Sequence, residues 1–309
     1  MYTLTKTEAQ GLQFIELSNA DQSTKATLCL TQGGRLSDLQ FNGIKVLADY
    51  APSTYKDNYA SAILFPFANR VKDGAYTFDG QDHALERNEV EKNNALHGLV
   101  YDKHFGLSGS NLQADQAEVT INYSHDGLSM GFPFKFDMAL TYKLTDGNLS
   151  LSVTVTNTDT KAFPFTLGWH PYFISKDLEQ SSLIFESDTR FLCDAQQIIS
   201  GSCPFVISMP YNLKGVILDD GYELQKPKVE FHTPEYILNI DSTSKENYLQ
   251  LYTPKTPNVI AIEPMTGAAD SFNNTIGLQI LKSNASYGVT WSIEITDQKQ
   301  PIHTNTLIR

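Results

Sequence analysis

Apolar and polar residues alternate along most of this 309-residue chain. The alternation is regular in residues 25–34 (KATLCLTQGG) and 117–127 (AEVTINYSHDG), and each stretch ends at a turn that contains glycine. A period of two residues places successive side chains on opposite faces of a half-buried β-strand. The 3.6-residue period of an amphipathic helix is not sustained over any long window. The pattern therefore predicts an all-β protein.

Two strands around a tight turn are predicted for residues 134–159, FKFDMALTYKLTDGNLSLSVTVTNTD. The turn falls at Asp146-Gly147-Asn148, and Asp-Gly between alternating apolar residues is a strong hairpin signal. The same alternation returns in residues 248–254, 258–264 and 287–296. Such strands, separated at short intervals by turn residues, are typical of a large antiparallel β-sandwich with two packed sheets.

Composition and charge narrow the class of protein. No low-complexity linker, composition shift or repeat divides the sequence, so we expect one domain over residues 1–309. Hydrophobic residues make up 41% of the chain, enough for a substantial core. The net charge of −12 and the scattered arginines argue against a nucleic acid or a membrane as partner, because both select clustered cations. A small neutral ligand suits this charge better.

The cysteines and the N-terminal residues bear on the location. Cys29, Cys193 and Cys203 form no CxxC pair, and no basic segment followed by an apolar run stands at the N-terminus. No apolar run approaches the roughly 20 residues that span a bilayer. We therefore expect reduced thiols and a cytoplasmic protein. The pattern does not indicate an oligomeric state.

Two stretches place polar groups beside apolar or turn-forming residues. In residues 64–71 (LFPFANRV), Asn69 and Arg70 follow an apolar run. Arg70 is either a charged strand end or a guanidinium at a pocket edge, where its fork can donate to two hydroxyls or a carboxylate. In residues 93–100 (NNALHGLV), His97 precedes a glycine that permits close backbone approach, and is either a turn residue or a ligand-binding group. The spacing predicts no metal site.

A third stretch, residues 165–173 (FTLGWHPYF), sets one titratable ring in an apolar segment. His170 is either a core histidine or an acid that works near neutral pH, where the unperturbed pKa of histidine lies. In the second interpretation, Trp169, Tyr172 and Phe173 supply apolar faces that stack on a sugar ring.

Carboxylates mark two further stretches. Glu263 ends the apolar run of residues 258–264 and is either a surface residue or a partly buried base, because burial raises the pKa of a carboxyl. Asp219 and Asp220 lie in residues 216–224 (VILDDGYEL), which also read as an ordinary turn.

The motifs together resemble those of one family, the aldose 1-epimerases or galactose mutarotases. The resemblance rests on the order of NR at 69–70, LHG at 96–98, GWHPYF at 168–173 and IEP at 262–264. It covers about residues 31–295, and it implies an antiparallel supersandwich with the sugar in an open cleft on one sheet. It also implies catalysis without a metal or other cofactor. One departure is visible: the family usually carries a tryptophan shortly after HG, where this chain has YDKHF.

The resemblance implies roles for individual residues. His170 matches the family's catalytic acid and Glu263 its catalytic base. The expected substrate-binding residues are Arg70, His97, Asp219 in preference to the adjacent Asp220, Asn69 and Trp169.

The implied chemistry is the interconversion of the α and β anomers of a free aldose such as galactose or glucose. A base removes the C1 hydroxyl proton, an acid protonates the ring oxygen, the C1–C2 bond rotates and the ring closes on the other face. Glu263 as carboxylate and His170 as imidazolium suit these steps, and we expect each charge to help keep the other.

Three alternatives remain open from the residues. A hexose-6-phosphate 1-epimerase on the same fold needs two or more cations at the pocket. A glycosidase or lyase would use Glu263 and Asp219 as a carboxylate pair and leave His170 structural. A non-catalytic carbohydrate-binding module would keep the aromatic residues and Arg70 but needs neither Glu263 nor His170.

Overall fold

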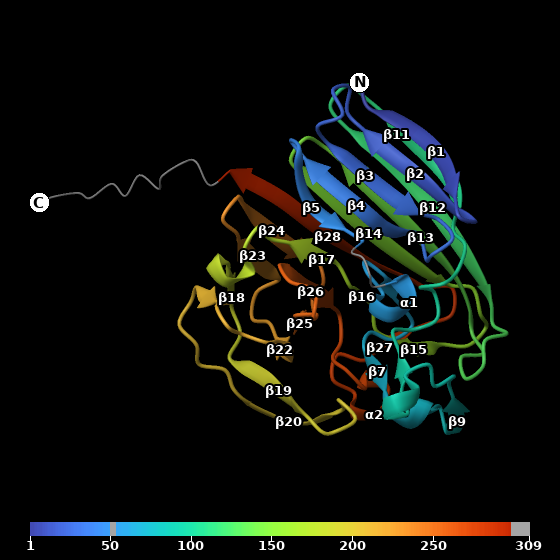
Figure 1. Ribbon diagram of the computed structural model, residues 1–309. Coiled ribbons are helices and arrows are strands. Elements are labelled where there is room, and N and C mark those ends of the chain that lie inside the picture. The colour runs from blue at the N-terminus through green and yellow to red at the C-terminus, as the bar shows by residue number, and fades with distance from the viewer. Residues whose placement is uncertain (50–53, 298–309) are drawn as a thin grey trace, which may run out of the picture.

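The computed structural model describes residues 1–49 and 54–297. The parts of the expected domain that fall on residues 50–53 and 298–309 lie outside the described residues. Two large sheets dominate the described chain, and every pairing between their strands is antiparallel. The predicted all-β sandwich is confirmed (Figure 1).

The larger sheet has 13 strands. In spatial order its main path runs β1 (Thr3–Ala9), β2 (Leu12–Ser18), β3 (Lys25–Cys29), β4 (Arg35–Phe41), β5 (Ile44–Ala48), β17 (Tyr172–Ile174), β26 (Val259–Met265), β25 (Tyr248–Tyr252), β22 (Asp219–Glu223), β19 (Thr189–Cys193) and β20 (Ile199–Pro204). The short strand β16 (Gly168–Trp169) pairs with β26 and with β6 (Ile63–Leu64).

The second sheet has nine strands. Its order is β11 (Gly106–Leu112), β12 (Ala117–Asp126), β13 (Lys135–Leu144), β14 (Asn148–Asn157), β28 (Ser286–Asp297), β24 (Tyr236–Ser242), β23 (Lys228–His232), β18 (Ser182–Phe185) and β21 (Tyr211–Asn212). The predicted hairpin around Asp146 is β13–β14, in which Leu144 pairs with Leu149. The three late stretches of alternation became β25, β26 and β28.

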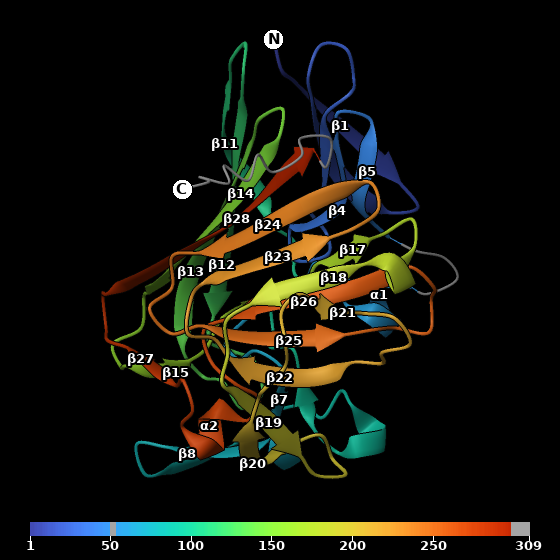
Figure 2. The same cartoon turned by 90° about the vertical axis from the view of Figure 1, so that its left-hand side faces the viewer.

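Small elements complete the fold. They are the pairs β7 (Arg70–Val71) with β10 (Ala95–Leu96), β8 (Ala75–Phe78) with β9 (Gln81–Ala84) and β15 (Phe163–Phe165) with β27 (Gln279–Leu281), the helices α1 (Tyr55–Asn58) and α2 (Ser271–Asn274), and the 3-10 turns 72–74, 90–92 and 178–180. Of these, β7, β8, β9 and α2 lie toward the lower end of Figures 1 and 2. Strands β19 and β20 of the larger sheet reach the lower end beside α2 and β8 (Figure 2).

The core lies between the two sheets. Burial alternates along β14, as the sequence predicts. One hydrophobic cluster joins side chains of both sheets, including Leu149, Leu151, Val153, Leu249, Leu251, Ile260 and Ile262. Strand β26 is buried at all seven positions, on both faces. One face packs in this core, and the other carries Glu263.

Candidate active site

The strand register places the candidate residues on one face of the larger sheet. Gln250 of β25 pairs with Glu263 of β26 and, on its other side, with Gly221 of β22. Directly paired residues in an antiparallel sheet point to the same face, and so do residues two positions apart. Asp219 therefore shares this face with Glu263 and Gln250. The core-facing neighbours Leu249 and Ile262 point the other way.

His170 and Glu263 form a buried pair. The His170 Nε2 atom lies 3.3 Å from Glu263 Oε1, and the side chains are only 6% and 2% exposed. This separation is slightly longer than an ordinary hydrogen bond, so a small approach of the two side chains would allow a proton transfer between them. The structure thus brings together the two residues that the family resemblance assigns to the acid and the base, although they are far apart in the chain.

Backbone and ring contacts fix the position of His170. Its backbone N–H donates to the Ala62 carbonyl, and its own carbonyl accepts from the Ser61 N–H at 2.7 Å. The imidazole stacks on the Tyr172 ring at 4.9 Å between centroids. The Tyr172 hydroxyl donates to the Asn58 carbonyl at 3.1 Å. His170 is therefore held on a rigid frame, and its ring has little freedom to turn away from Glu263.

Burial controls the charge of the pair. Desolvation lowers the pKa of His170 to about 4, and the positive charge of Arg70 acts in the same direction. Desolvation also raises the pKa of Glu263 well above its usual value, with a further contribution from the negative Asp219. Both shifts favour the neutral forms. The expected mutual support of two full charges is therefore wrong, because burial outweighs it.

A second histidine borders the pair. The His97 ring stands edge-on to the His170 ring, with centroids 5.0 Å apart. Desolvation lowers the pKa of His97 well below its usual value, so it is neutral. The Nδ1 atoms of His97 and His170 and Oε2 of Glu263 are buried and have no hydrogen-bond partner in the described part of the chain. Buried polar atoms are normally satisfied, so these three leave unused hydrogen-bonding capacity around the pair.

Left-handed backbone conformations join the NR and HG motifs. Asn69 and His97 have φ of 58° and 64°, and the His97 N–H donates to the Asn69 carbonyl at 2.8 Å. Gly98 also has a positive φ, and a Cβ there would lie 2.2 Å from the Phe65 carbonyl oxygen. Only glycine fits that contact. The two motifs are thus locked together, as the β7–β10 pairing of Arg70 with Leu96 also shows.

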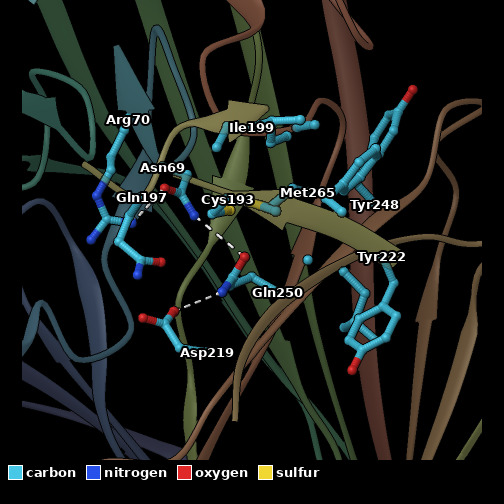
Figure 3. A pocket seen from close by; sticks show the side chains of 15 residues that line it. Asn69, Arg70, Cys193, Gln197, Ile199, Asp219, Tyr222, Tyr248, Gln250 and Met265 are labelled. Carbon is cyan, nitrogen blue, oxygen red and sulfur yellow. Dashed lines mark hydrogen bonds between the residues drawn. The ribbon is translucent and has the colours of Figure 1, made fainter. Parts of the chain in front are cut away.

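A pocket lies beside Gln250 on this face of the larger sheet, and Asn69, Arg70 and Asp219 also line it. A chain of side-chain hydrogen bonds crosses it (Figure 3): Asn69 Nδ2 donates to Gln250 Oε1 at 3.5 Å, and Gln250 Nε2 donates to Asp219 Oδ1 at 3.0 Å. Its lining does not include His170, His97 or Glu263. Gln250 connects the two regions, because it lines the pocket and pairs with Glu263 across the strands.

Arg70 stands at the edge of this pocket with its guanidinium fixed. Its Nε and Nη2 atoms donate to the two carboxylate oxygens of Glu89, each at 2.8 Å. Its Nη1 atom donates to Asn69 Oδ1 at 3.1 Å. The bidentate contact raises the pKa of Arg70, lowers that of Glu89 and keeps both charged. Sequence reasoning gave no sign of Glu89.

The two adjacent aspartates have different surroundings. Asp219 lines the pocket and accepts from Gln250, and desolvation raises its pKa. Asp220 points to the other face, where its Oδ1 lies 3.6 Å from Arg190 Nη1. The geometry thus places Asp219, and not Asp220, with the other candidates.

Trp169 is misplaced by the sequence interpretation. It is fully buried and stacks on Trp291 at 6.3 Å, within the core between the sheets. Phe173 is likewise a core residue. The reason is the alternation of the segment: His170 and Tyr172 face the site, so the residues beside them face the core. The expected aromatic contact of Trp169 and Phe173 with a sugar is therefore wrong.

Other aromatic residues border His97. The Tyr59 ring contacts His97 edge-on at 4.9 Å, and the Tyr101 ring contacts Tyr59 at 5.0 Å. Tyr101 begins the YDKHF stretch that departs from the family pattern. Tyr59 gave no sequence signal, whereas Gln250 was detectable in principle as the polar residue within the apolar run YLQLY.

Two other kinds of feature are absent from the described residues. No group of three or more His, Cys, Asp or Glu side chains within residues 1–49 and 54–297 is arranged to hold a metal ion. No helix in the same part of the chain is long and apolar enough to cross a membrane.

Comparison with known sequences identifies relatives. A family model described as Aldose 1-epimerase matches residues 13–294. The uncharacterized protein YihR of Escherichia coli K12 is 22% identical over 276 residues, which cover 85% of this chain and 88% of that protein. An aldose 1-epimerase of the same strain is 31% identical over 137 residues, which cover 43% of this chain and 38% of that enzyme.

Solved structures share the fold. A galactose mutarotase-like protein from Clostridium acetobutylicum superposes with a TM-score of 0.85 at 17% identity, over 96% of this chain and 98% of that one. A galactose 1-epimerase from Lactobacillus acidophilus gives 0.76 at 17% identity, over 96% and 99% of the two chains. At these identities the likeness concerns the fold. Together with the family match over residues 13–294, it shows that the chain belongs to the aldose 1-epimerase family.

Proposed function

We propose that this protein is an aldose 1-epimerase that interconverts the α and β anomers of a free, uncharged aldose such as galactose or glucose. The observation that carries the proposal is the buried pair of His170 Nε2 and Glu263 Oε1, 3.3 Å apart, with Glu263 on the same face of the larger sheet as a pocket with hydrogen-bonding side chains. A non-catalytic sugar-binding module has no need for a desolvated acid–base pair, which costs stability without a partner.

The reaction is a transfer of protons between fixed groups and two sugar oxygens. Glu263 accepts the proton of the C1 hydroxyl as the C1–O5 bond breaks, and His170 delivers a proton to O5. Rotation about C1–C2 then presents the other face of the aldehyde. Closure reverses both transfers, with the two residues exchanging roles. Each positioned group is worth roughly 10²–10⁴-fold in rate.

The pair starts this cycle with one proton shared between its members. Its neutral form has that proton on Glu263, and transfer across the 3.3 Å contact produces the carboxylate and imidazolium that the ring opening requires. Both forms contain the same number of protons, so the transfer needs no exchange with solvent. Asn69, Arg70, His97, Gln250 and Asp219 would hold the hydroxyls so that C1 and O5 stay aligned with the pair.

The alternatives meet specific difficulties in this site. Arg70 is the only cation among the described residues that line the pocket, and Glu89 already occupies its fork. This arrangement disfavours a hexose 6-phosphate. A glycosidase would leave unexplained why His170 is aimed at Glu263. For location, the thiols of Cys29, Cys193 and Cys203 are free, which supports a reducing, cytoplasmic compartment.

The direct test follows the optical rotation of freshly dissolved α-D-galactose and α-D-glucose as they relax to anomeric equilibrium. We expect the wild-type protein to accelerate at least one of them strongly at neutral pH. Glucose 6-phosphate and a chromogenic glycoside serve as the two competing substrates. Acceleration of the phosphorylated sugar alone, hydrolysis of the glycoside, or sugar binding without faster relaxation would each contradict the proposal and identify the alternative that replaces it.

A further inference from the structure

The contact between Arg70 and Glu89 bears on substrate choice. We infer that Glu89 is a specificity-determining residue: it occupies the anion-binding fork of Arg70 from outside the pocket, so that Arg70 serves neutral sugar hydroxyls and anionic sugars are excluded. The inference rests on the proposed function for the identity of the ligand as a sugar. The inference predicts that a carboxylate or phosphate group of a ligand does not bind beside Arg70.

Three of the N–H donors of the Arg70 guanidinium are already used by neighbouring side chains. Arginine has five N–H donors, and its Nε–Nη2 edge is one of the two edges that can hold a carboxylate or phosphate in a bidentate manner. Glu89 takes this edge with both oxygens at 2.8 Å. A third donor goes from Nη1 to Asn69. These three contacts leave one N–H on Nη1 and one on Nη2, which can donate to sugar hydroxyls, while the negative charge of Glu89 beside them disfavours an anion.

Asn94, in the same loop, fixes the position of Glu89. The Glu89 Oε2 atom also accepts from Asn94 Nδ2 at 3.0 Å, and its backbone forms a bridge with that of Asn94. Asn94 is fully buried, and its Nδ2 donates further to the Gln196 carbonyl at 2.8 Å. Glu89 does not line the pocket, whereas Arg70 does. The carboxylate therefore acts on a ligand through Arg70, as a positioning residue, and does not touch the ligand itself.

The charges around the pocket also disfavour an anionic ligand. Arg70 and Asp219 are the only charged residues among the described residues that line the pocket, and they cancel. Glu89 behind Arg70 adds a negative charge, which Lys92 at 3.7 Å partly offsets from a position 34% exposed to solvent. To bind in the fork, an anion would have to displace Glu89 and leave its carboxylate, now 15% exposed, without its main partner. Such an unpaired, partly buried charge is costly.

A purely structural role for Glu89 predicts a different behaviour. In that case its removal would loosen Arg70 and weaken all sugars alike. If Glu89 excludes anions, its replacement by the similarly shaped but neutral glutamine removes the negative charge that competes for Arg70 and changes the ratio of affinities in favour of an anionic sugar. The ratio distinguishes the two roles.

The test measures direct binding of D-glucose, D-glucuronate and D-glucose 6-phosphate by isothermal titration calorimetry. The proteins are the wild type, Glu89→Gln, Glu89→Asp and Glu91→Gln. We expect the affinity ratio of anionic to neutral sugar to rise about tenfold or more in Glu89→Gln, which corresponds to about 1.4 kcal/mol. Glu89→Asp keeps the charge and should keep the wild-type ratio. Glu91→Gln removes the same charge from an exposed position in the same loop and should leave the ratio unchanged.

The outcomes separate this inference from the proposed function. A higher affinity ratio for glucuronate or for glucose 6-phosphate in Glu89→Gln supports the inference and shows which anionic group fits. Wild-type binding of an anion as tight as that of glucose overturns it, and so does an unchanged ratio in Glu89→Gln, including the case in which neither protein binds an anion. Relaxation of optical rotation on the same samples tests the epimerase activity independently, because anion binding requires no turnover.

Discussion

The pairs His170–Glu263 and Arg70–Glu89 each bring a basic side chain against a glutamate, but their electrostatic states are opposite. The first pair is 6% and 2% exposed, makes one contact at 3.3 Å and leaves further polar atoms without partners. The second is 13% and 15% exposed, makes two contacts at 2.8 Å and is supported by Asn69 and Asn94. Burial without sufficient partners favours neutral groups, whereas saturation with hydrogen bonds favours charged ones.

The difference shows how one site can contain both a mobile proton and a fixed charge. Arginine keeps its proton under all ordinary conditions, so Arg70 can orient a ligand but cannot serve as an acid. Histidine and a desolvated carboxyl have pKa values that allow exchange of a proton between them. We therefore assign the proton transfer to His170 and Glu263, and the positioning of the ligand to Arg70 and Glu89.

The largest effect is expected from changes to the buried pair. Glu263→Gln or His170→Asn removes one proton acceptor or donor and should lower kcat/KM for sugar interconversion about 10²–10⁴-fold, or about 3–5 kcal/mol of transition-state stabilisation. Polarimetry measures it. Glu223→Gln is the matched control, because Glu223 is an exposed residue of β22, and the change there should have little effect. Equal losses in the control and in Glu263→Gln would contradict the assignment.

A smaller loss of kcat/KM is expected when the contact between Arg70 and Glu89 is weakened. Arg70→Lys keeps the charge but loses the bidentate contact to Glu89, and a lost charged hydrogen bond costs about 1.5–3 kcal/mol. The expected fall in kcat/KM is on the order of 10–100-fold. Arg190→Lys is the control, since Arg190 makes a 3.6 Å contact with Asp220 and is 41% exposed. If the two variants behave alike, Arg70 has no special role.

The pH dependence of the rate should reflect the proton count of the buried pair. With one proton the pair holds both a donor and an acceptor. As the pH falls through about 4, the pKa to which burial lowers His170, a second proton binds and the acceptor is lost. On the alkaline side, the rate falls when the pair loses its remaining proton, above the usual pKa of glutamate because burial raises that of Glu263.

The measurement is kcat/KM against pH in buffers of constant ionic strength. We expect a bell-shaped curve with a broad top near neutrality and an acid limb close to pH 4. An acid limb near pH 6.5 would indicate a solvent-exposed histidine instead. A value of kcat/KM that does not change between pH 4 and pH 9 would contradict the acid–base role altogether.

The smallest effect on catalysis is expected at Trp169. Because Trp169 packs on Trp291 in the core, Trp169→Phe should lower the free energy of unfolding by about 1–3 kcal/mol and change kcat/KM by less than about threefold. Urea denaturation and polarimetry on the same protein separate these effects. A large rise in KM with unchanged stability would return Trp169 to the ligand site.

The strand pattern and the separated motifs made the fold and most of the site predictable. Alternation placed β14, β25 and β26 correctly, because a period of two is a local property of the chain. The motifs around Arg70, His97, His170 and Glu263 predicted residues that the structure brings together. The role of each stays a proposal.

The errors and omissions have physical causes. Trp169 was misassigned because neighbours in a strand face opposite sides, and the sequence alone does not show which side faces the core. The charge state of His170 and Glu263 depends on how completely other strands cover them, which is a property of the tertiary structure. Glu89 was missed because its contact with Arg70 arises from the folding of the loop before β10, where no periodicity marks it.

The most direct test of the account is a double-variant experiment on the buried pair. Mutarotation of galactose or glucose is followed by polarimetry for the wild type, Glu263→Gln, His170→Asn and the double variant, each checked for folding by circular dichroism. If the two residues act as one proton-transfer unit, either single change abolishes nearly all the acceleration and the double change lowers it no further. Independent, additive losses, or a folded single variant that keeps most of the activity, would contradict the central claim.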